Sequence, residues 1–452
     1  MYPAPPPAAT TPAPSVRRPR LRGVDAARGV ALLGMVAVHV VDPTTAAGDP
    51  HPVFLGFAGR ASVLFVLLAG VGLALSTGGT RPAEGARRAA LRRRITRRAG
   101  LLFVVGLACG ALGTPVAVIL CHYALLFLLA LPLLGLRAPA LGAIAGAWLV
   151  VGPVAVFAAS TAGQALLGRD EFLLGARLWL SPMPEDLLTP GVLLADLVVT
   201  GYYPVLSWGA FLVLGLALGR LPLDRARVAA ALLAAGALAW GAAAAAGAAV
   251  LRAPGVLERI AAGTGADPAQ LTATLRTGEH RLAYLPPDPL WLALPTPHGG
   301  SPVAALLAAG WACAVLGLCL LVGAALDRAL AGRTSADRGA TPAVGSAHGS
   351  AATGAATGVG AGLAGLVRAA ARPLTGAGRI PLTLYVGHLL VLAAASRLEI
   401  DASDAAVLTV LVALCLAAGL AADLTGRRGP LESAVARLSR AGEADAPPPV
   451  GR

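Results

Sequence analysis

The sequence contains no lysine and no asparagine, and only 13% of its 452 residues are charged. All 36 basic residues are therefore arginines, and the lack of asparagine excludes N-glycosylation sequons. Hydrophobic residues make up 56% of the chain, and they form runs of about 20 residues, the length of a membrane-spanning helix. This composition excludes an ordinary soluble protein and predicts an integral membrane protein.

Cysteine is also scarce. The five cysteines form no C-x-x-C pair, so the sequence supports neither a zinc site nor a disulfide framework, and we expect no metal. The stretch Met1–Pro14 lacks the apolar segment of a signal peptide. We therefore expect the first span to be an uncleaved anchor.

The net charge of +13 raises the question of nucleic-acid binding. The arginines, however, cluster in particular segments between the apolar runs, as the positive-inside rule predicts for cytoplasmic loops. No aromatic and basic platform for a single strand accompanies them. We expect the lipid bilayer, and not nucleic acid, to be the partner of this charge.

The hydropathy pattern predicts an all-α fold, a polytopic integral membrane helical bundle of about ten transmembrane helices. Glycines four residues apart predict close helix packing at three pairs, 106/110, 142/146 and 215/219. The expected spans are Gly29–Val41, Ala61–Ser76, Gly100–Leu112, Val116–Leu134, Leu141–Ala159, Val205–Leu218, Val228–Val250, Val303–Leu326, Pro381–Ala395 and Ala405–Ala422.

Arginine clusters alternate with loops that also carry acids, which predicts that both termini are cytoplasmic. The largest cluster, Arg87–Arg98, separates the second and third spans and is expected to be a loop. The expected organisation is a disordered tail (1–22), a transmembrane domain with eight spans (23–326), a Gly/Ala-rich cytoplasmic linker (327–378), two further spans of the same domain (379–428) and a cytoplasmic tail (429–452).

Several ionisable residues lie at or near membrane depth on the side opposite the arginine clusters, where they are costly and usually functional. His39 ends the first span, His51 follows in a short loop, and Arg60 begins the second span. A histidine here can act as a base or nucleophile, whereas a solvated loop histidine is the simpler interpretation of His51. Arg60 could orient a carboxylate or polarise a carbonyl.

A second group comes from later spans and from the cytoplasmic mouth. Tyr385 and His388 are three residues apart and share a helix face, and His298 lies where a long loop re-enters the membrane. Asp25 and Arg28 are also three apart. They either pair with each other or leave Arg28 to receive an anionic cofactor.

Two of these segments carry a resemblance. Val24–Leu32 (VDAARGVAL) resembles the opening signature of the heparan-alpha-glucosaminide N-acetyltransferase-like family, within the transmembrane acyltransferase superfamily, and Tyr385–His388 (YVGH) resembles its late-span motif. The blocks Gly59–Gly70, Pro297–Pro302 and Arg428–Glu432 are similar to a bacterial branch of unknown function.

The resemblance implies acetyl transfer from cytoplasmic acetyl-CoA, or another acyl-CoA, to a sugar or cell-envelope acceptor across a bacterial plasma membrane. His51 occupies the place of the family's key catalytic histidine, with His39 and His388 as further catalytic candidates. Arg60, Tyr385 and His298 would contact substrate. Asp25 and Arg28 would receive the cofactor, and a helix rises roughly 16 Å from Arg28 to His39, a distance that a pantetheine arm can cover.

Three functions remain open at this point. The same intramembrane charges would also suit a transporter or permease for a small polar or anionic solute, although no internal repeat of the kind common in transporters is evident. The third is a non-catalytic partner of an envelope-synthesis complex. The oligomeric state is open, with a homodimer among the options.

Overall fold

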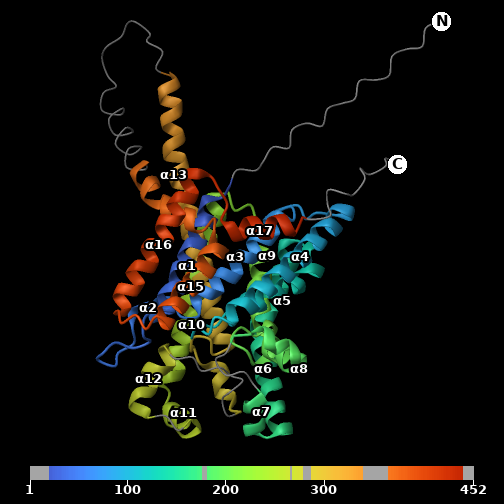
Figure 1. Cartoon of the computed structure of the whole chain (residues 1–452), viewed down its shortest axis with the longest axis vertical. Coiled ribbons are helices and arrows are strands. Elements are labelled where there is room, and N and C mark those ends of the chain that lie inside the picture. Colours follow the sequence, from blue (N-terminus) through green and yellow to red (C-terminus); the bar gives the residue numbers. More distant parts are fainter. Residues whose placement is uncertain (1–19, 176–180, 265–266, 278–286, 340–364, 441–452) are drawn as a thin grey trace, which may run out of the picture.

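The computed structural model describes residues 20–175, 181–264, 267–277, 287–339 and 365–440. This part of the chain is 78% helical and contains no strand (Figure 1), which confirms the all-α prediction. The helices are α1 (Arg22–Val38), α2 (Pro52–Phe57), α3 (Arg60–Ser76), α4 (Gly85–Gly110), α5 (Leu120–Ala130), α6 (Ala138–Leu167), α7 (Arg169–Gly175), α8 (Pro190–Ala195), α9 (Val205–Gly219), α10 (Ala226–Arg252), α11 (Val256–Thr264), α12 (Pro268–Thr277), α13 (Pro302–Gly339), Gly365–Ala377, α15 (Pro381–Arg397), α16 (Asp404–Thr425) and α17 (Pro430–Leu438).

Five helices of the described chain are long and apolar enough to cross a membrane, and two bent helix pairs raise the number to seven. The count of about ten is therefore not confirmed. The difference lies in α1, which has 17 residues, in α5, which has 11, and in α4, whose first half is rich in arginine. The protein is nonetheless a multi-pass membrane protein by the number of its apolar helices.

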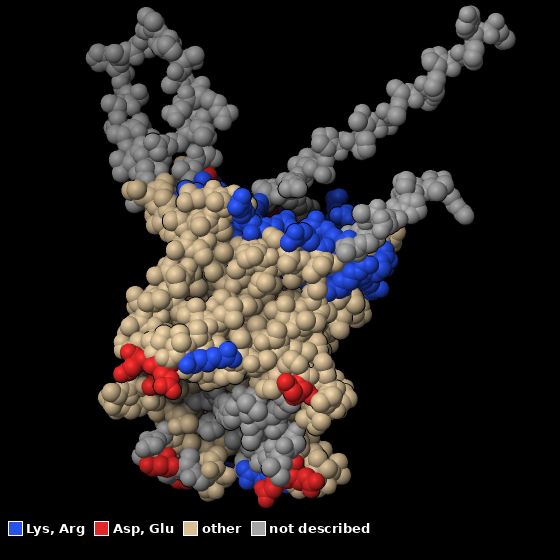
Figure 2. Space-filling model, viewed as in Figure 1, with Lys and Arg blue, Asp and Glu red and all other residues tan. Residues whose placement is uncertain are grey.

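The arginines gather at one end of the molecule, which we call the Arg-rich end (Figure 2). It is formed by the first half of α4, the start of α15 and α17, while α7, α11 and α12 lie at the opposite end (Figure 1). The predicted loop Arg87–Arg98 is wrong, because these residues form the first half of α4. Arginine and alanine are both good helix formers, so the charged run continues into the apolar one as a single helix.

The expected linker, residues 327–378, is helical at both of its ends. Helix α13 continues to Gly339, and another helix covers Gly365–Ala377. The remaining residues of the expected linker, 340–364, lie outside the described residues, as do most of the two predicted tails.

The centre of the bundle is the contact between α3 and α9, which depends on glycine. A Cβ atom on Gly215 would lie 2.0 Å from the carbonyl oxygen of Leu67, and one on Gly70 would lie 2.2 Å from that of Leu212. Leu67 and Leu212 are fully buried beside this contact. The small residues let the two backbones touch, as the 215/219 spacing predicts.

Of the other two predicted glycine pairs, one is packed against neighbouring backbone and the other is not. Gly106 meets α5 at Cys121, and Gly110 meets the carbonyl of Pro182, so both are packed as expected. Around Gly142 and Gly146 there is nothing within 4 Å of an added Cβ. The packing predicted for this last pair is wrong, because the α6 surface that carries it is not covered by another described helix.

We predict that Gly215→Ala destabilises the protein and that Gly142→Ala does not. The new methyl group at position 215 overlaps backbone of α3, and such overpacking costs about 1–3 kcal/mol. At position 142 the methyl group meets open space, and alanine is favoured over glycine in a helix by roughly 0.5–1 kcal/mol. Thermal unfolding in detergent measures the difference, and equal melting temperatures for the two variants would contradict the packing described here.

Candidate active site

Two histidines from the first and the late part of the chain meet in the middle of the bundle. His39 follows the last turn of α1, and His388 lies on α15. Their atoms Nδ1 and Nε2 are 3.1 Å apart, and the two rings are stacked with an angle of 11° between their planes. At this distance one imidazole donates a hydrogen bond to the other. The pair can therefore take up and pass on a proton.

Tyr385 extends this pair toward the Arg-rich end. It lies one helical turn before His388, and the two rings contact edge to face at a centroid distance of 5.1 Å. Its phenol oxygen accepts a hydrogen bond from the backbone N–H of Ile119, at 3.3 Å. Tyr385 and His388 are each only 2% exposed, so packing fixes both rings.

Tyr385 also forms part of the wall of a cavity at the Arg-rich end, with a volume of about 300 Å³. We call it the Arg-side cavity. Arg98 extends over the ring of Phe127, 5.1 Å from its centroid, which is a cation–π arrangement. The guanidinium groups of Arg28, Arg98 and Arg379 all border this cavity. The lining residues include Arg28, Gly72, Arg98, Tyr123, Phe127, Arg379, Tyr385 and Glu432.

Two carboxylates hold the arginines of this cavity. Asp25 is buried and pairs with Arg28 at 3.2 Å, and it also binds the Arg20 side chain. This hydrogen bond to Asp25 raises the pKa of Arg20. The predicted contact between Asp25 and Arg28 is thus present, and Arg28 still reaches the cavity wall. Its role in receiving an anionic cofactor stays a prediction.

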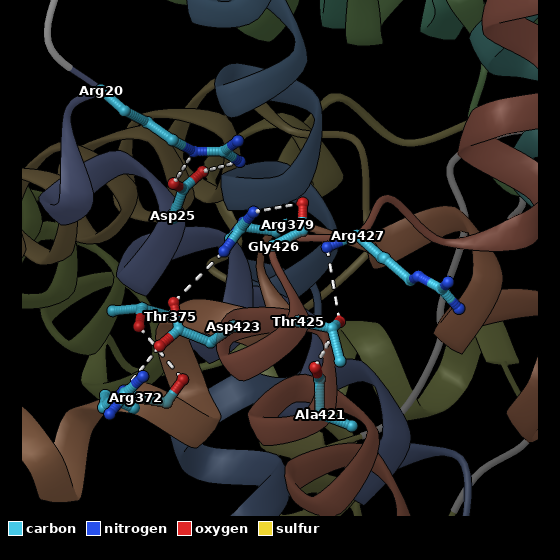
Figure 3. Close-up of polar contacts among 10 residues, drawn as sticks. All are labelled: Arg20, Asp25, Arg372, Thr375, Arg379, Ala421, Asp423, Thr425, Gly426 and Arg427. Atoms are coloured by element: carbon cyan, nitrogen blue, oxygen red, sulfur yellow. Dashed lines mark hydrogen bonds and ion pairs between the residues drawn. The ribbon is translucent and has the colours of Figure 1, made fainter.

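Arg379 is held in the same manner from α16. Asp423 accepts hydrogen bonds from Arg372 at 2.7 Å and from Arg379 at 3.2 Å, and the same Arg379 side chain reaches the carbonyl of Gly426 (Figure 3). Since an anchored arginine loses little freedom when an anion binds, the cavity is prepared for a phosphate or a similar group.

Glu432 closes the cavity from α17. Its carboxylate accepts hydrogen bonds from the backbone N–H groups of Leu382 and Thr383 at 2.7 and 3.1 Å, and from the Thr383 hydroxyl at 2.5 Å. These donors belong to the first turn of α15, where a negative charge is stabilised by the helix dipole. Glu432 therefore docks α17 on the helix that carries Tyr385 and His388.

A second cavity lies on the other side of the histidine pair, with a volume of about 170 Å³. We call it the far cavity. His39 belongs to its wall, together with His298 and the adjacent aromatic residues Tyr202 and Tyr203. Tyr385 therefore borders the Arg-side cavity and His39 borders the far cavity, and His388 contacts both of these residues.

The loop that carries His298 is held in a special conformation. His298 has a positive φ of 54°, which is rare for a residue other than glycine and common at functional sites. Gly59 packs against this loop: a Cβ atom added to Gly59 would lie 3.3 Å from the backbone nitrogen of His298. The His298 ring lies 4.5 Å from the ring of Tyr202 and is stacked on Trp208 at 6.0 Å.

Arg60 and His51 do not line the same wall as His39. Arg60 borders a neighbouring cavity, and its Nη1 donates a hydrogen bond to the carbonyl of Leu55. His51 is the N-cap residue of α2, and its Nδ1 accepts a hydrogen bond from the Val53 N–H at 3.2 Å. His51 therefore has a structural task in this state, and its catalytic role stays a prediction.

The sequence did not single out several residues that the structure brings to the site, including Arg379 and Tyr202. Tyr123 and Arg98 line the Arg-side cavity, and Tyr203 lines the far cavity. Nothing in the sequence distinguished Tyr203, and Arg98 was only one of many arginines. A tyrosine within an apolar run, such as Tyr123, was the one signal that could have been followed, because a buried hydroxyl needs a partner.

A comparison of the sequence with protein families shows which family the chain belongs to. The model of the family described as heparan-alpha-glucosaminide N-acetyltransferase, catalytic, matches residues 20–251, just over half of the chain. The chain belongs to this family. No curated protein and no solved structure matches it.

Membership in the heparan-alpha-glucosaminide N-acetyltransferase family indicates that the protein has an activity of the membrane acetyltransferase type. The matched region includes Asp25, Arg28, His39, His51 and Arg60, and it ends before the segments that carry His298 and His388. In the described residues no three or more His, Cys, Asp or Glu side chains are grouped to hold a metal ion.

We predict that Glu432→Ala loosens α17 from the start of α15. Removing a carboxylate that accepts from the first turn of a helix costs about 1 kcal/mol, and here it also removes the main polar contact of α17. Limited proteolysis should cut the variant at α17 faster than the original protein. Arg437→Ala, on an exposed position of the same helix, is the control, and equal cleavage of the two variants would contradict the docking role.

Proposed function

We propose that this member of the heparan-alpha-glucosaminide N-acetyltransferase family moves an acetyl or other acyl group from acyl-CoA to an acceptor. The acyl-CoA binds at the Arg-rich end, and the acceptor binds in the far cavity. We propose further that the Arg-rich end faces the cytoplasm of a bacterial cell and that the acceptor is a sugar or another envelope component. The observation that carries the proposal is the His39–His388 contact of 3.1 Å, with His39 in the wall of the far cavity and Tyr385, one turn before His388, in the wall of the Arg-side cavity.

The donor fits the Arg-side cavity by charge and by shape. Coenzyme A carries phosphates at one end and a thin pantetheine arm at the other. Arg28, Arg98 and Arg379 supply positive charge around the cavity, and Tyr385 lies at its inner wall. Since the cavity is smaller than coenzyme A, the arm enters it while the nucleotide stays at the Arg-rich surface. The thioester then lies on the Tyr385 side of the histidine pair.

The reaction needs one proton transfer and one bond exchange. The acceptor's hydroxyl or amine attacks the thioester carbonyl, the carbon–sulfur bond breaks, and the acyl group forms a new bond to oxygen or nitrogen. His39, whose Nδ1 is engaged by His388, has Nε2 left to take the acceptor's proton. The proton returns to the thiolate of coenzyme A. The Tyr385 hydroxyl, which accepts from Ile119, retains its own hydrogen to donate to the developing oxyanion.

We predict that His39→Ala and His388→Ala each lower acyl transfer by about 10²–10⁴-fold, the usual contribution of a general base. The assay uses membranes that contain the protein and radiolabelled acetyl-CoA, and it measures label recovered outside coenzyme A. If both variants keep the original rate, the histidine pair is not the reaction centre. Absence of any turnover or acetyl-CoA binding in the original protein would favour a transporter instead.

His51 requires a pair of variants, because it caps α2 as well as being a catalytic candidate. Asparagine keeps a cap acceptor and removes the imidazole, while alanine removes both. If the imidazole reacts, His51→Asn and His51→Ala lose acyl transfer alike. If His51 acts only as a cap, the asparagine variant keeps the rate.

A further inference from the structure

A third cavity, with a volume of about 60 Å³, adjoins the far cavity and is lined mostly by apolar residues. The two share Gly59, Tyr202 and His298 in their walls. The third cavity continues from there between apolar residues of α6 and α13, among them Val156 and Leu307. We call it the lateral cavity. A ligand could therefore occupy both cavities at once, with chemically different parts in each.

The walls of the lateral cavity belong to helices that face the lipid. Both α6 and α13 are long and apolar enough to span a membrane. Directly beside the cavity residues Pro153 and Leu307, the side chains Val154 and Leu306 are 40% and 41% exposed. Apolar surface of this extent on a spanning helix contacts hydrocarbon. The lateral cavity is thus lined in part by two helices whose outer sides face the bilayer.

A positive charge stands at the junction between the two cavities. Arg60 begins α3 next to Gly59 and lines the lateral cavity. Leu55 occupies only Nη1, and Nε is buried without a hydrogen-bond partner among the described residues. A buried guanidinium nitrogen without a partner is costly, and guanidinium binds carboxylates and phosphates in a bidentate manner. Of these two groups, phosphate is the one that most membrane lipids carry.

We infer that the acyl acceptor is an amphiphile, a membrane lipid with a phosphate near its polar end. The part of its hydrocarbon chain nearest the phosphate lies in the lateral cavity, its phosphate binds Arg60, and its hydroxyl or amine reaches His39 in the far cavity. This inference rests on the proposed function and names the class of its acceptor. It also explains why the apolar and polar cavities share one wall, which a water-soluble sugar would not require.

The test measures binding of a dodecyl phosphate with a photoreactive diazirine at the end of its chain, against the matching dodecanol. The protein is kept in lipid nanodiscs, and crosslinked peptides are mapped by mass spectrometry. We expect crosslinks to α6 and α13, and about tenfold tighter binding of the phosphate than of the alcohol, as a charged hydrogen bond gives. In Arg60→Gln this preference for the phosphate should disappear.

Two variants on α13 form a matched pair. Ala304 is half-buried in the cavity wall and Leu306 points outward. Ala304→Phe should fill the cavity and abolish crosslinking by both probes, whereas Leu306→Phe should leave it unchanged. Unaltered melting temperature and acetyl-CoA binding show that the Ala304→Phe protein is folded, and if that variant is unfolded, Arg60→Gln alone decides.

Crosslinks that survive Ala304→Phe, or equal binding of phosphate and alcohol to the original protein, would overturn the inference. So would acetyl label that appears only in water-soluble products and is unaffected by Ala304→Phe, although acyl transfer itself would then stand. Conversely, the expected crosslinks in a protein that neither binds nor turns over acetyl-CoA would retain the amphiphile site and refute the proposed function.

Discussion

The contact between His39 and His388 is the interaction on which the site depends. It joins the end of α1 to the middle of α15, two positions separated by 349 residues in the chain. Both imidazoles lie where water is scarce, so each ring needs the other to satisfy its hydrogen-bonding atoms. Through Tyr385, the pair also links the wall of the Arg-side cavity to the wall of the far cavity.

The surrounding helices hold this contact in place by close packing and by anchored charges. The glycines of α3 and α9 let these helices touch, which gives α1 and α13 a compact surface to pack on. At the Arg-rich end, Glu432 fixes the start of α15, and Asp25 and Asp423 fix the arginines. At the Arg-rich end, a charge placed at a helix end or in a salt bridge carries only a small free-energy penalty. The same groups deeper in the bundle would carry a large one. The polar residues are thus kept to the ends and to one central chain.

Part of this arrangement is predictable from the sequence. The spacing of Tyr385 and His388 places them on one helix face, and the short separation of Asp25 and Arg28 predicts their ion pair. Both are local relations within a helix. The approach of His388 to His39 is a tertiary contact, which periodicity cannot reveal, and the same holds for the joining of Gly59 to the His298 loop.

The errors have equally physical causes. A run of arginines indicated a loop, but arginine tolerates a helix well, and the run forms the start of α4. The glycine pair on α6 has the spacing of a packed interface, but spacing does not say whether another helix is present to meet it. The count of about ten spans is not confirmed, because short apolar helices such as α5 have the hydropathy of a span without its length.

The most direct test asks from which side each cavity can be reached. Cysteine is introduced at Arg379 in the Arg-side cavity and, separately, at Tyr202 in the far cavity, in vesicles of known orientation. A membrane-impermeant maleimide should label the two positions from opposite sides, and acetyl-CoA should protect position 379 when added on the Arg-rich side. Labelling of both positions from one side, or protection of position 202 by acetyl-CoA, would contradict a site with two cavities divided by the histidine pair.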